Sequence, residues 1–386
     1  MDKALIIELL YHHECVEILY KIYKNNYHTS LYIGEFVNTF IDISNISNEN
    51  VRIISQPVRC KKFKVEGIKR LLYEFVEFFE FLKNSVKIVI YIRREKPDVI
   101  HLVTVENPFI VLLVYLIYFF YKGSIAVTLH ETHRWGIDKR LFHFSDYLLY
   151  WIHFRLLSKK ISYFSVLGEY LKIPNSLKKK FFFVINNRDI EIQEYEYVSD
   201  NITFTITGSV KIKRKNYSLV LRAFNKLFSK NPELKKSVNI VLLGKMKSPM
   251  ISNMIKEHNL VECTTTFYEF IKEKTFKDFV KKSDFLIVPT YRDSPYGSTK
   301  ISGSFGDAVS FGIPFLLPKY YAEGFTFPEN IIRFDDDSLE DTLFDCIKLK
   351  FSKNEYMKLK DKAIMYSKKF KETMERVDFN ELKHIE

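Results

Sequence analysis

The chain has 386 residues, a hydrophobic fraction of 47% and only 12 Gly and 11 Pro, which excludes a disordered or linker-rich protein and favours two domains with ample core. Its four cysteines form no CxxC pair, which argues against a zinc or disulfide framework and favours a reduced compartment. The net charge of +12 suits phosphate-bearing ligands or an anionic membrane face, and without a recognisable nucleic-acid module we expect no nucleic-acid partner.

The first half of the chain alternates between short apolar runs and helical patterns. Pro97 ends one helical pattern and Pro108 opens the next. Strands are predicted at 4–10, 29–34, 51–55, 98–105, 124–129, 161–166 and 181–185, and helices at 14–24, 67–94 (one long helix or two), 108–121 and 138–158.

The second half repeats this rhythm. Strands are predicted at 203–207, 238–243, 264–267, 285–288, 315–317 and 330–334, with helices at 217–228, 249–257, 276–282 and 304–311 and two more at the end of the chain. Alternating strands and helices predict parallel sheets with right-handed crossovers. We therefore expect an α/β protein with two doubly wound Rossmann-like domains facing a cleft, at 1–190 and 198–352, and C-terminal helices at 353–386 that pack back toward the first domain.

The stretch 283–318 is the most informative part of the sequence. A buried strand leads into a loop with Ser298, Thr299 and Lys300, and the next helix opens on Ser302, Gly303 and Ser304. A helix N-terminus with small residues favours anions, because its free N–H groups and the helix dipole point outward. The pattern predicts a site for a phosphate-bearing ligand linked to a nucleotide, and serines that also cap the helix.

Several segments, in this order, resemble retaining glycosyltransferases of the GT-B fold, close to family 4. The resemblance covers nearly the whole chain. The matching segments are KPDVIH (96–101), TLHET (128–132), EYLK (169–172), VINNRD (184–189), TGS (207–209), RKNY (214–217), AF (223–224), KSD to PT (282–290) and GDA to GIP (306–314).

The resemblance implies a glycosyltransferase that moves a sugar from a nucleoside-diphosphate sugar to a hydroxyl acceptor with retention. The acceptor would be a glycan, a glycolipid or a lipid-linked intermediate. A front-face reaction requires no side-chain nucleophile, and neither a cofactor nor a metal is expected. Two alternatives stay open: a catalytically silent binding subunit, and a GT-B enzyme of another kind, such as a sugar-nucleotide epimerase.

By the resemblance, Lys215 contacts the diphosphate and Asp307 holds the ribose hydroxyls. Ser209 stands where the family has an Arg, so Arg214 and its basic neighbours are candidates to replace it, and Thr299 stands at the first of the family's paired acids. A solvated basic loop and a surface carboxylate are the structural alternatives. The expected donor-binding residues are Gly208, Ser209, Arg214, Lys215, Phe270, Ser298, Thr299, Lys300, Ser302, Gly303, Ser304 and Asp307.

In the first domain, the resemblance assigns His130 to the donor sugar near its anomeric centre. Glu131 would bind acceptor hydroxyls or orient His130. The alternative for His130 is a buried histidine bonded to backbone. His13 and Glu14, after the first strand, are candidate acceptor contacts, although Glu14 is equally suited to a helix start.

A membrane contact is suggested by 138–160, which mixes aromatic with basic residues. A core-facing helix with charged ends explains the same pattern. The N-terminus has an early acidic residue and no long apolar core, so we expect no signal peptide. The expectation is a cytoplasmic protein in peripheral contact with the inner face of the membrane.

Overall fold

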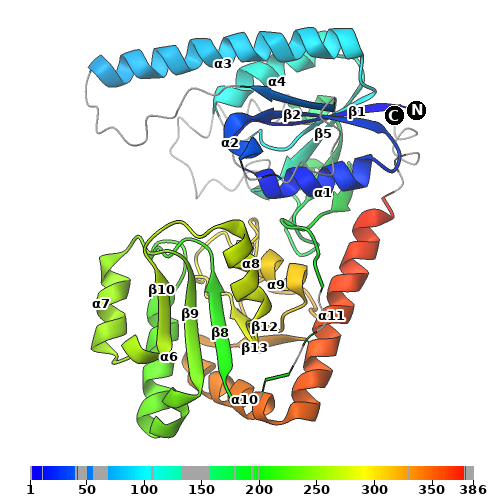
Figure 1. The fold of residues 1–386 in the computed structure, drawn as a ribbon. Coiled ribbons are helices and arrows are strands. Elements are labelled where there is room, and N and C mark those ends of the chain that lie inside the picture. Colours follow the sequence, from blue (N-terminus) through cyan, green and yellow to red (C-terminus); the bar gives the residue numbers. More distant parts are fainter. Residues whose placement is uncertain are drawn as a thin grey trace. The chain divides into compact units, whose positions relative to one another are not determined.

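The computed structural model describes residues 2–10, 12–39, 41, 50–54, 68–105, 108–132, 157–177, 180–192, 195, 197–198, 200–328, 330–377 and 379. The chain divides into two compact units (Figure 1). The first unit comprises Met1–Ile185 together with Met374–Glu386, and the second comprises Asn186–Thr373.

The first unit is built on a parallel sheet in the order β3-β2-β1-β4-β5-β6-β7. Chain order reverses between β1 and β4, which makes the carboxyl ends of these two strands the topological switch point. The strands are β1 (Lys3–Glu8), β2 (His28–Gly34), β3 (Val51–Ile54), β4 (Val99–Leu102), β5 (Ser124–Leu129), β6 (Ile161–Val166) and β7 (Phe181–Val184), and the helices are α1 (His13–Tyr23), α2 (Glu35–Asn38), α3 (Ile68–Glu95) and α4 (Pro108–Phe120).

Helices α3 and α4 supply buried side chains to one apolar cluster with alternate residues of the sheet. A buried polar network occupies another part of this unit: His101 is bonded to Tyr23 (2.9 Å) and to Thr128 (2.9 Å), and Tyr23 to Tyr163 (2.8 Å). Burial lowers the pKa of His101 to about 3, so this imidazole stays neutral. Phe379, near the chain end, stacks on Tyr23 with ring centroids 4.6 Å apart, which joins the last segment to this unit.

The second unit contains a parallel sheet in the order β10-β9-β8-β11-β12-β13. Its switch point lies between β8 and β11. The strands are β8 (Ile202–Thr207), β9 (Val238–Lys245), β10 (Thr264–Phe267), β11 (Phe285–Ile287), β12 (Phe315–Pro318) and β13 (Ile331–Phe334), and the helices are α6 (Tyr217–Lys230), α7 (Pro249–Glu257), α8 (Glu273–Lys281), α9 (Gly303–Phe311), α10 (Leu339–Phe351) and α11 (Lys353–Glu375).

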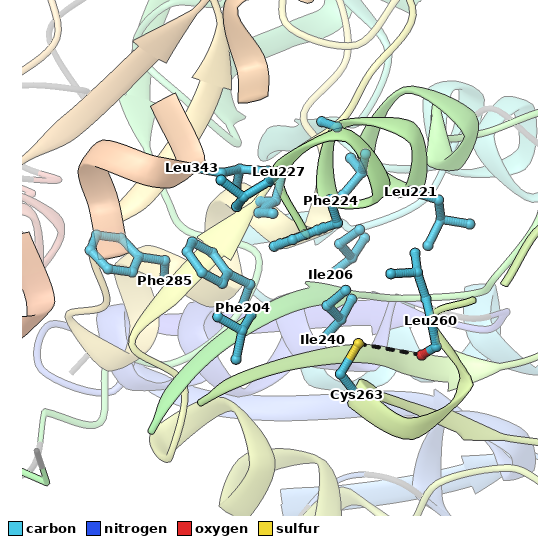
Figure 2. Packing of buried hydrophobic residues seen from close by; sticks show 14 of the residues in the cluster. Phe204, Ile206, Leu221, Phe224, Leu227, Ile240, Leu260, Cys263, Phe285 and Leu343 are labelled. Atoms are coloured by element: carbon cyan, nitrogen blue, oxygen red, sulfur yellow. Dashed lines mark hydrogen bonds between the residues drawn. The ribbon is translucent and has the colours of Figure 1, made fainter. Parts of the chain in front are cut away.

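Figure 2 shows the apolar core on one face of this sheet, where Phe204, Ile240 and Phe285 meet α6 residues such as Phe224. Helices α7 and α10 add to the same cluster. Helix α9 packs on the opposite face of the sheet. Its Phe305 ring lies 5.2 Å from the Phe315 ring, measured between centroids. Phe315 points away from the first cluster, because the next residue of β12, Leu316, belongs to that cluster and successive strand residues face opposite sides. Both faces are therefore covered, as expected for a parallel sheet.

The predicted α/β class with two parallel sheets is confirmed, and most strand and helix bounds agree to within a few residues. The long helical pattern at 67–94 forms a single helix. The short α2 was not predicted. Helix α8 begins at Glu273 rather than at 276, because the carbonyl oxygen of the extended N-cap residue Lys272 already accepts a hydrogen bond from the Phe276 N–H (2.9 Å). The predicted helix at 138–158 lies outside the described residues except for its last two residues, 157 and 158. Among the described helices, none has the length and apolar character needed to cross a bilayer.

Candidate functional site

Lys215 lies at the switch point of the second unit. Its ammonium donates to the carbonyl oxygen of Thr207, the last residue of β8, and to Ser304 Oγ in the first turn of α9 (2.7 Å). Ser304 Oγ also donates to the Thr207 carbonyl (3.1 Å). The predicted phosphate-contacting lysine and the predicted helix start are therefore brought together at one carboxyl edge of the sheet.

The Lys215 side chain is only 9% exposed, and burial lowers its pKa to about 8. The negative charge of Asp307 opposes this shift, and the positive charge of Arg214 adds to it. A nearby anion strongly stabilises an ammonium that has lost most of its hydration, because charges attract more strongly away from water. The solvated-loop alternative is therefore wrong for Lys215, although Lys213 and Arg214 are exposed.

The turn after β8 contains a glycine in the left-handed region, surrounded by buried hydroxyl groups. Gly208 has φ +90°, a conformation that favours glycine. Around it, the hydroxyl oxygens of Thr207, Ser209 and Thr290 are buried and have no hydrogen-bond partner among the described residues. Buried hydroxyls without partners are uncommon, and a bound polar ligand is one way to satisfy them. Sequence reasoning selected Ser209 but gave no role to Thr207, the last residue of a predicted strand, or to Thr290, which follows the predicted strand at 285–288.

The α9 N-terminus offers fewer free groups than the sequence predicted. Ser302 occupies the N-cap position, but its side chain makes no capping hydrogen bond, so the predicted serine cap is wrong here. Its backbone N–H donates to Tyr321 Oη (3.2 Å). Gly303 is exposed, and as the first helical residues Gly303 and Ser304 have N–H groups without an intrahelical acceptor.

The loop before α9 folds back on itself. The N–H groups of Ser298, Thr299 and Lys300 all point to the carbonyl oxygen of Pro295, at 3.3, 3.1 and 3.0 Å. Ser298 Oγ donates to the same oxygen (3.2 Å). This turn satisfies its own amides, so the predicted contacts of Ser298, Thr299 and Lys300 with a ligand cannot use these backbone N–H groups.

Asp307 is buried, 5% exposed, so the alternative of a helix-surface carboxylate is wrong. Its Oδ1 accepts a hydrogen bond from Arg188 Nε (3.1 Å). Arg188 also pairs with Glu273 at the start of α8. Sequence reasoning placed Arg188 in a matching segment without giving it a role, because its partner is 119 positions away.

Phe270, one of the expected donor-binding residues, is 69% exposed after β10, and the nearby Tyr268 is 62% exposed. Exposed aromatic rings beside a strand end offer a stacking surface.

At the switch point of the first unit, His130 is buried and its Nε2 donates to the carbonyl oxygen of Val103 (2.8 Å). The ring of His12 stacks on it, with centroids 3.7 Å apart. The alternative of a buried histidine bonded to backbone therefore describes the Nε2 atom of His130. His13 and Glu14 lie together at the start of α1, with His13 Nε2 and Glu14 Oε1 3.5 Å apart.

Glu8 and Thr104, to which sequence reasoning gave no role, lie at the same edge. Glu8, at the end of β1, accepts hydrogen bonds from the backbone N–H of Leu10 (2.6 Å) and from Thr104 Oγ1 (2.5 Å). A buried acid at the end of an apolar strand was the available signal. Glu131 follows His130 and is half-buried. In the described ranges, no cluster of three His, Cys, Asp or Glu side chains is arranged to hold a metal ion.

No protein-family model and no curated protein matches the sequence. Solved structures match over almost the full length. A glycosyltransferase from Rickettsia africae is 12% identical, with a TM-score of 0.65 and coverage of 100% of this chain and 98% of that chain. The chain has the GT-B fold.

Two further solved structures are also similar to this chain over most of its length. A sucrose-phosphate synthase from Thermosynechococcus elongatus is 10% identical, with a TM-score of 0.63 and coverage of 99% and 96%. A putative UDP-N-acetylglucosamine 2-epimerase from Listeria monocytogenes is 11% identical, with a TM-score of 0.55 and coverage of 93% and 90%. At these identities the comparison establishes the fold, and residue roles have to be argued from the site.

Proposed function

We propose that this GT-B protein is a glycosyltransferase that moves a sugar from a nucleoside-diphosphate sugar to a hydroxyl acceptor with retention of configuration. The observation that carries the proposal is the buried ammonium of Lys215 beside the N-terminus of α9, at the switch point of the second sheet. This arrangement fits a diphosphate, because fixed positive charge and N–H donors stabilise that leaving group.

In this proposal, Lys215 and the N–H groups of Gly303 and Ser304 hold the diphosphate as the anomeric C–O bond breaks. The leaving phosphate oxygen takes the proton of the acceptor hydroxyl on the same face of the sugar. Asp307 accepts a ribose hydroxyl and Phe270 lies beside the base. His130 contacts the donor sugar, and Glu131, His13 and Glu14 contact the acceptor.

The acceptor would be a glycan, a glycolipid or a lipid-linked intermediate, and the protein would act in the cytoplasm in peripheral contact with a membrane. The helix on which that contact was based lies mostly outside the described residues. The proposed functional organisation is an acceptor-side domain at 1–190, a nucleotide-sugar-binding domain at 198–352 and C-terminal helices at 353–386, whereas the compact units of the structure divide at 185/186 and 373/374.

A catalytically silent donor-binding subunit is the second candidate. The observation that favours it is Thr299, which stands where the resemblance predicts an acid and whose N–H is used within the Pro295 turn.

The test is a panel of nucleoside-diphosphate sugars, with thermal shift reporting binding and mass spectrometry reporting release of free sugar. One donor is expected to raise the melting temperature by mass action and to be hydrolysed slowly. Both effects should be lost in Lys215→Ala, while His130→Ala should lose hydrolysis. Lys213→Ala, which removes an exposed lysine of the same loop, is the matched control. Binding without release would identify the silent subunit, epimerised nucleotide sugar would identify an epimerase, and no binding by any donor would refute the proposal.

A further inference from the structure

The segment after Ile185 is fixed on α9. Asn186 Nδ2 donates to the carbonyl oxygen of Gly306 (3.1 Å) and to Ser310 Oγ (2.9 Å). The backbone N–H of Glu191 donates to the carbonyl oxygen of Ser310 (2.8 Å). A Cβ at Gly306 would overlap the side-chain amide of Asn187, so glycine at 306 is what lets the segment lie against the helix. These contacts hold the intervening Arg188 in one place.

The guanidinium of Arg188 is held on three sides. Nε donates to Asp307 Oδ1 (3.1 Å), Nη1 pairs with Glu273, and the guanidinium carbon lies 5.0 Å from the centre of the Phe276 ring. The side chain is 13% exposed. A planar guanidinium suits this arrangement, because its donors diverge in fixed directions and its face stacks on an aromatic ring.

This arrangement makes the two oxygens of Asp307 unequal. Oδ1 accepts from Arg188, whereas no hydrogen bond from any described residue reaches Oδ2. The carboxylate side chain is 7% exposed, so its orientation is set by Arg188 rather than by bulk water. An ionised carboxylate in this state has one oxygen ready to accept from a ligand hydroxyl.

We propose that Arg188 is a positioning residue for nucleotide recognition: it orients Asp307 so that Oδ2 accepts one ribose hydroxyl of a nucleoside diphosphate. This inference rests on the proposed function. Lys215 contacts Ser304, one helical turn before Asp307, so the diphosphate site and the proposed ribose site lie along the same helix. Specificity for ribose over deoxyribose would then depend on Arg188, although Arg188 touches no part of the ligand.

The experiment is calorimetric titration of the full chain with the nucleoside diphosphate that gives the largest thermal shift, with its 2′-deoxy and 3′-deoxy forms, and with inorganic pyrophosphate. Wild type is expected to bind the ribonucleotide about 10- to 100-fold more tightly than one of the deoxy forms, the range for one hydrogen bond to a charged group. In Arg188→Lys, this ratio should fall to about threefold or less, while pyrophosphate binds within about twofold of wild type.

Lys277→Ala is the matched control. It removes an ion pair with Glu191, in the same segment, without touching Asp307, so the ribose-to-deoxyribose ratio should stay at the wild-type value. The Arg188→Lys substitution keeps a positive charge at position 188, and a melting curve checks that this variant folds.

Three results would overturn the inference. The first is equal binding of the ribonucleotide and both deoxy forms by wild type. The second is an unchanged ratio in Arg188→Lys. The third is a parallel loss of pyrophosphate and nucleotide binding, which would make Arg188 a phosphate contact or a purely structural residue. If no nucleoside diphosphate binds wild type at all, the proposed function fails together with the inference.

Discussion

The two sheets share the same strand order around their first strand, but the polar groups at their carboxyl edges are satisfied differently. In the first unit, both oxygens of Glu8 accept hydrogen bonds, and His130 donates to the carbonyl of Val103. In the second, the hydroxyls of Thr207 and Thr290 are buried without described partners.

This difference indicates where a tightly held ligand belongs. A buried polar atom without a partner costs about 1–3 kcal/mol, and a fold tolerates that cost where a ligand supplies the missing bond. The lowered pKa of Lys215 also indicates a ligand at the second edge, because a bound anion would stabilise the ammonium that burial destabilises. At the first edge, Glu8 and His130 instead use their hydrogen bonds to fix neighbouring loops.

The largest expected effect is on turnover in Lys215→Met. Removing a charge that stabilises the leaving diphosphate should lower kcat/KM for donor hydrolysis by about 100- to 1000-fold. The melting temperature should not fall, because an apolar side chain relieves the burial of a charge. Steady-state rates with the donor found by the panel, compared with Lys213→Met, measure this. An equal loss of kcat/KM in Lys215→Met and Lys213→Met would contradict the special role of the buried lysine.

The next effect is the pH dependence of diphosphate binding. Burial lowers the pKa of Lys215 to about 8, so its ammonium is present below that pH and is lost above it. Calorimetric affinity for pyrophosphate should fall by up to about tenfold per pH unit above pH 8, where the neutral amine dominates in the free protein, until Lys215 in the complex also loses its proton.

Stability of the ligand-free protein should change in the opposite direction. The folded pKa lies below the ordinary lysine value, so between about pH 8 and 10.5 the unfolded chain holds more protons and stability rises with pH. Denaturant unfolding at several pH values measures this contribution, which Lys215→Met should abolish. Identical profiles for the two proteins would show that Lys215 titrates normally.

A matched pair of threonine substitutions compares the two edges directly. Thr104→Val removes a bond to Glu8 and should destabilise the protein by about 1–3 kcal/mol. Thr207→Val removes a buried hydroxyl without a described partner and should stabilise the ligand-free protein by up to about 1 kcal/mol while weakening nucleotide binding. Chemical denaturation and calorimetry report the two quantities. Equal destabilisation by both substitutions would contradict the contrast between the edges.

The smallest expected effect is that of His12→Ala. Loss of the stack on His130 should cost about 0.5–1.5 kcal/mol of stability and leave pyrophosphate affinity unchanged. Thermal unfolding and the same titration measure both. A change in pyrophosphate affinity would show that the first edge also contacts the diphosphate.

Much of the fold and part of the site follow from local pattern. The apolar runs and the prolines at 97 and 108 predicted the order of strands and helices, because strand and helix periodicity are properties of neighbouring residues. Lys215 and the α9 start were both found from their segments. Their meeting through the Thr207 carbonyl follows from the strand order that parallel connections impose.

The sequence by itself therefore determined the class of fold, the alternation of its elements and the segment where an anion site lies. Only the tertiary structure decided which groups there already have partners: Ser302 N–H with Tyr321, Asp307 with Arg188, and Glu8 with Thr104. The physical reason is that periodicity and helix termini depend on neighbours in the chain, whereas the satisfaction of a buried polar atom depends on residues that folding brings from far away.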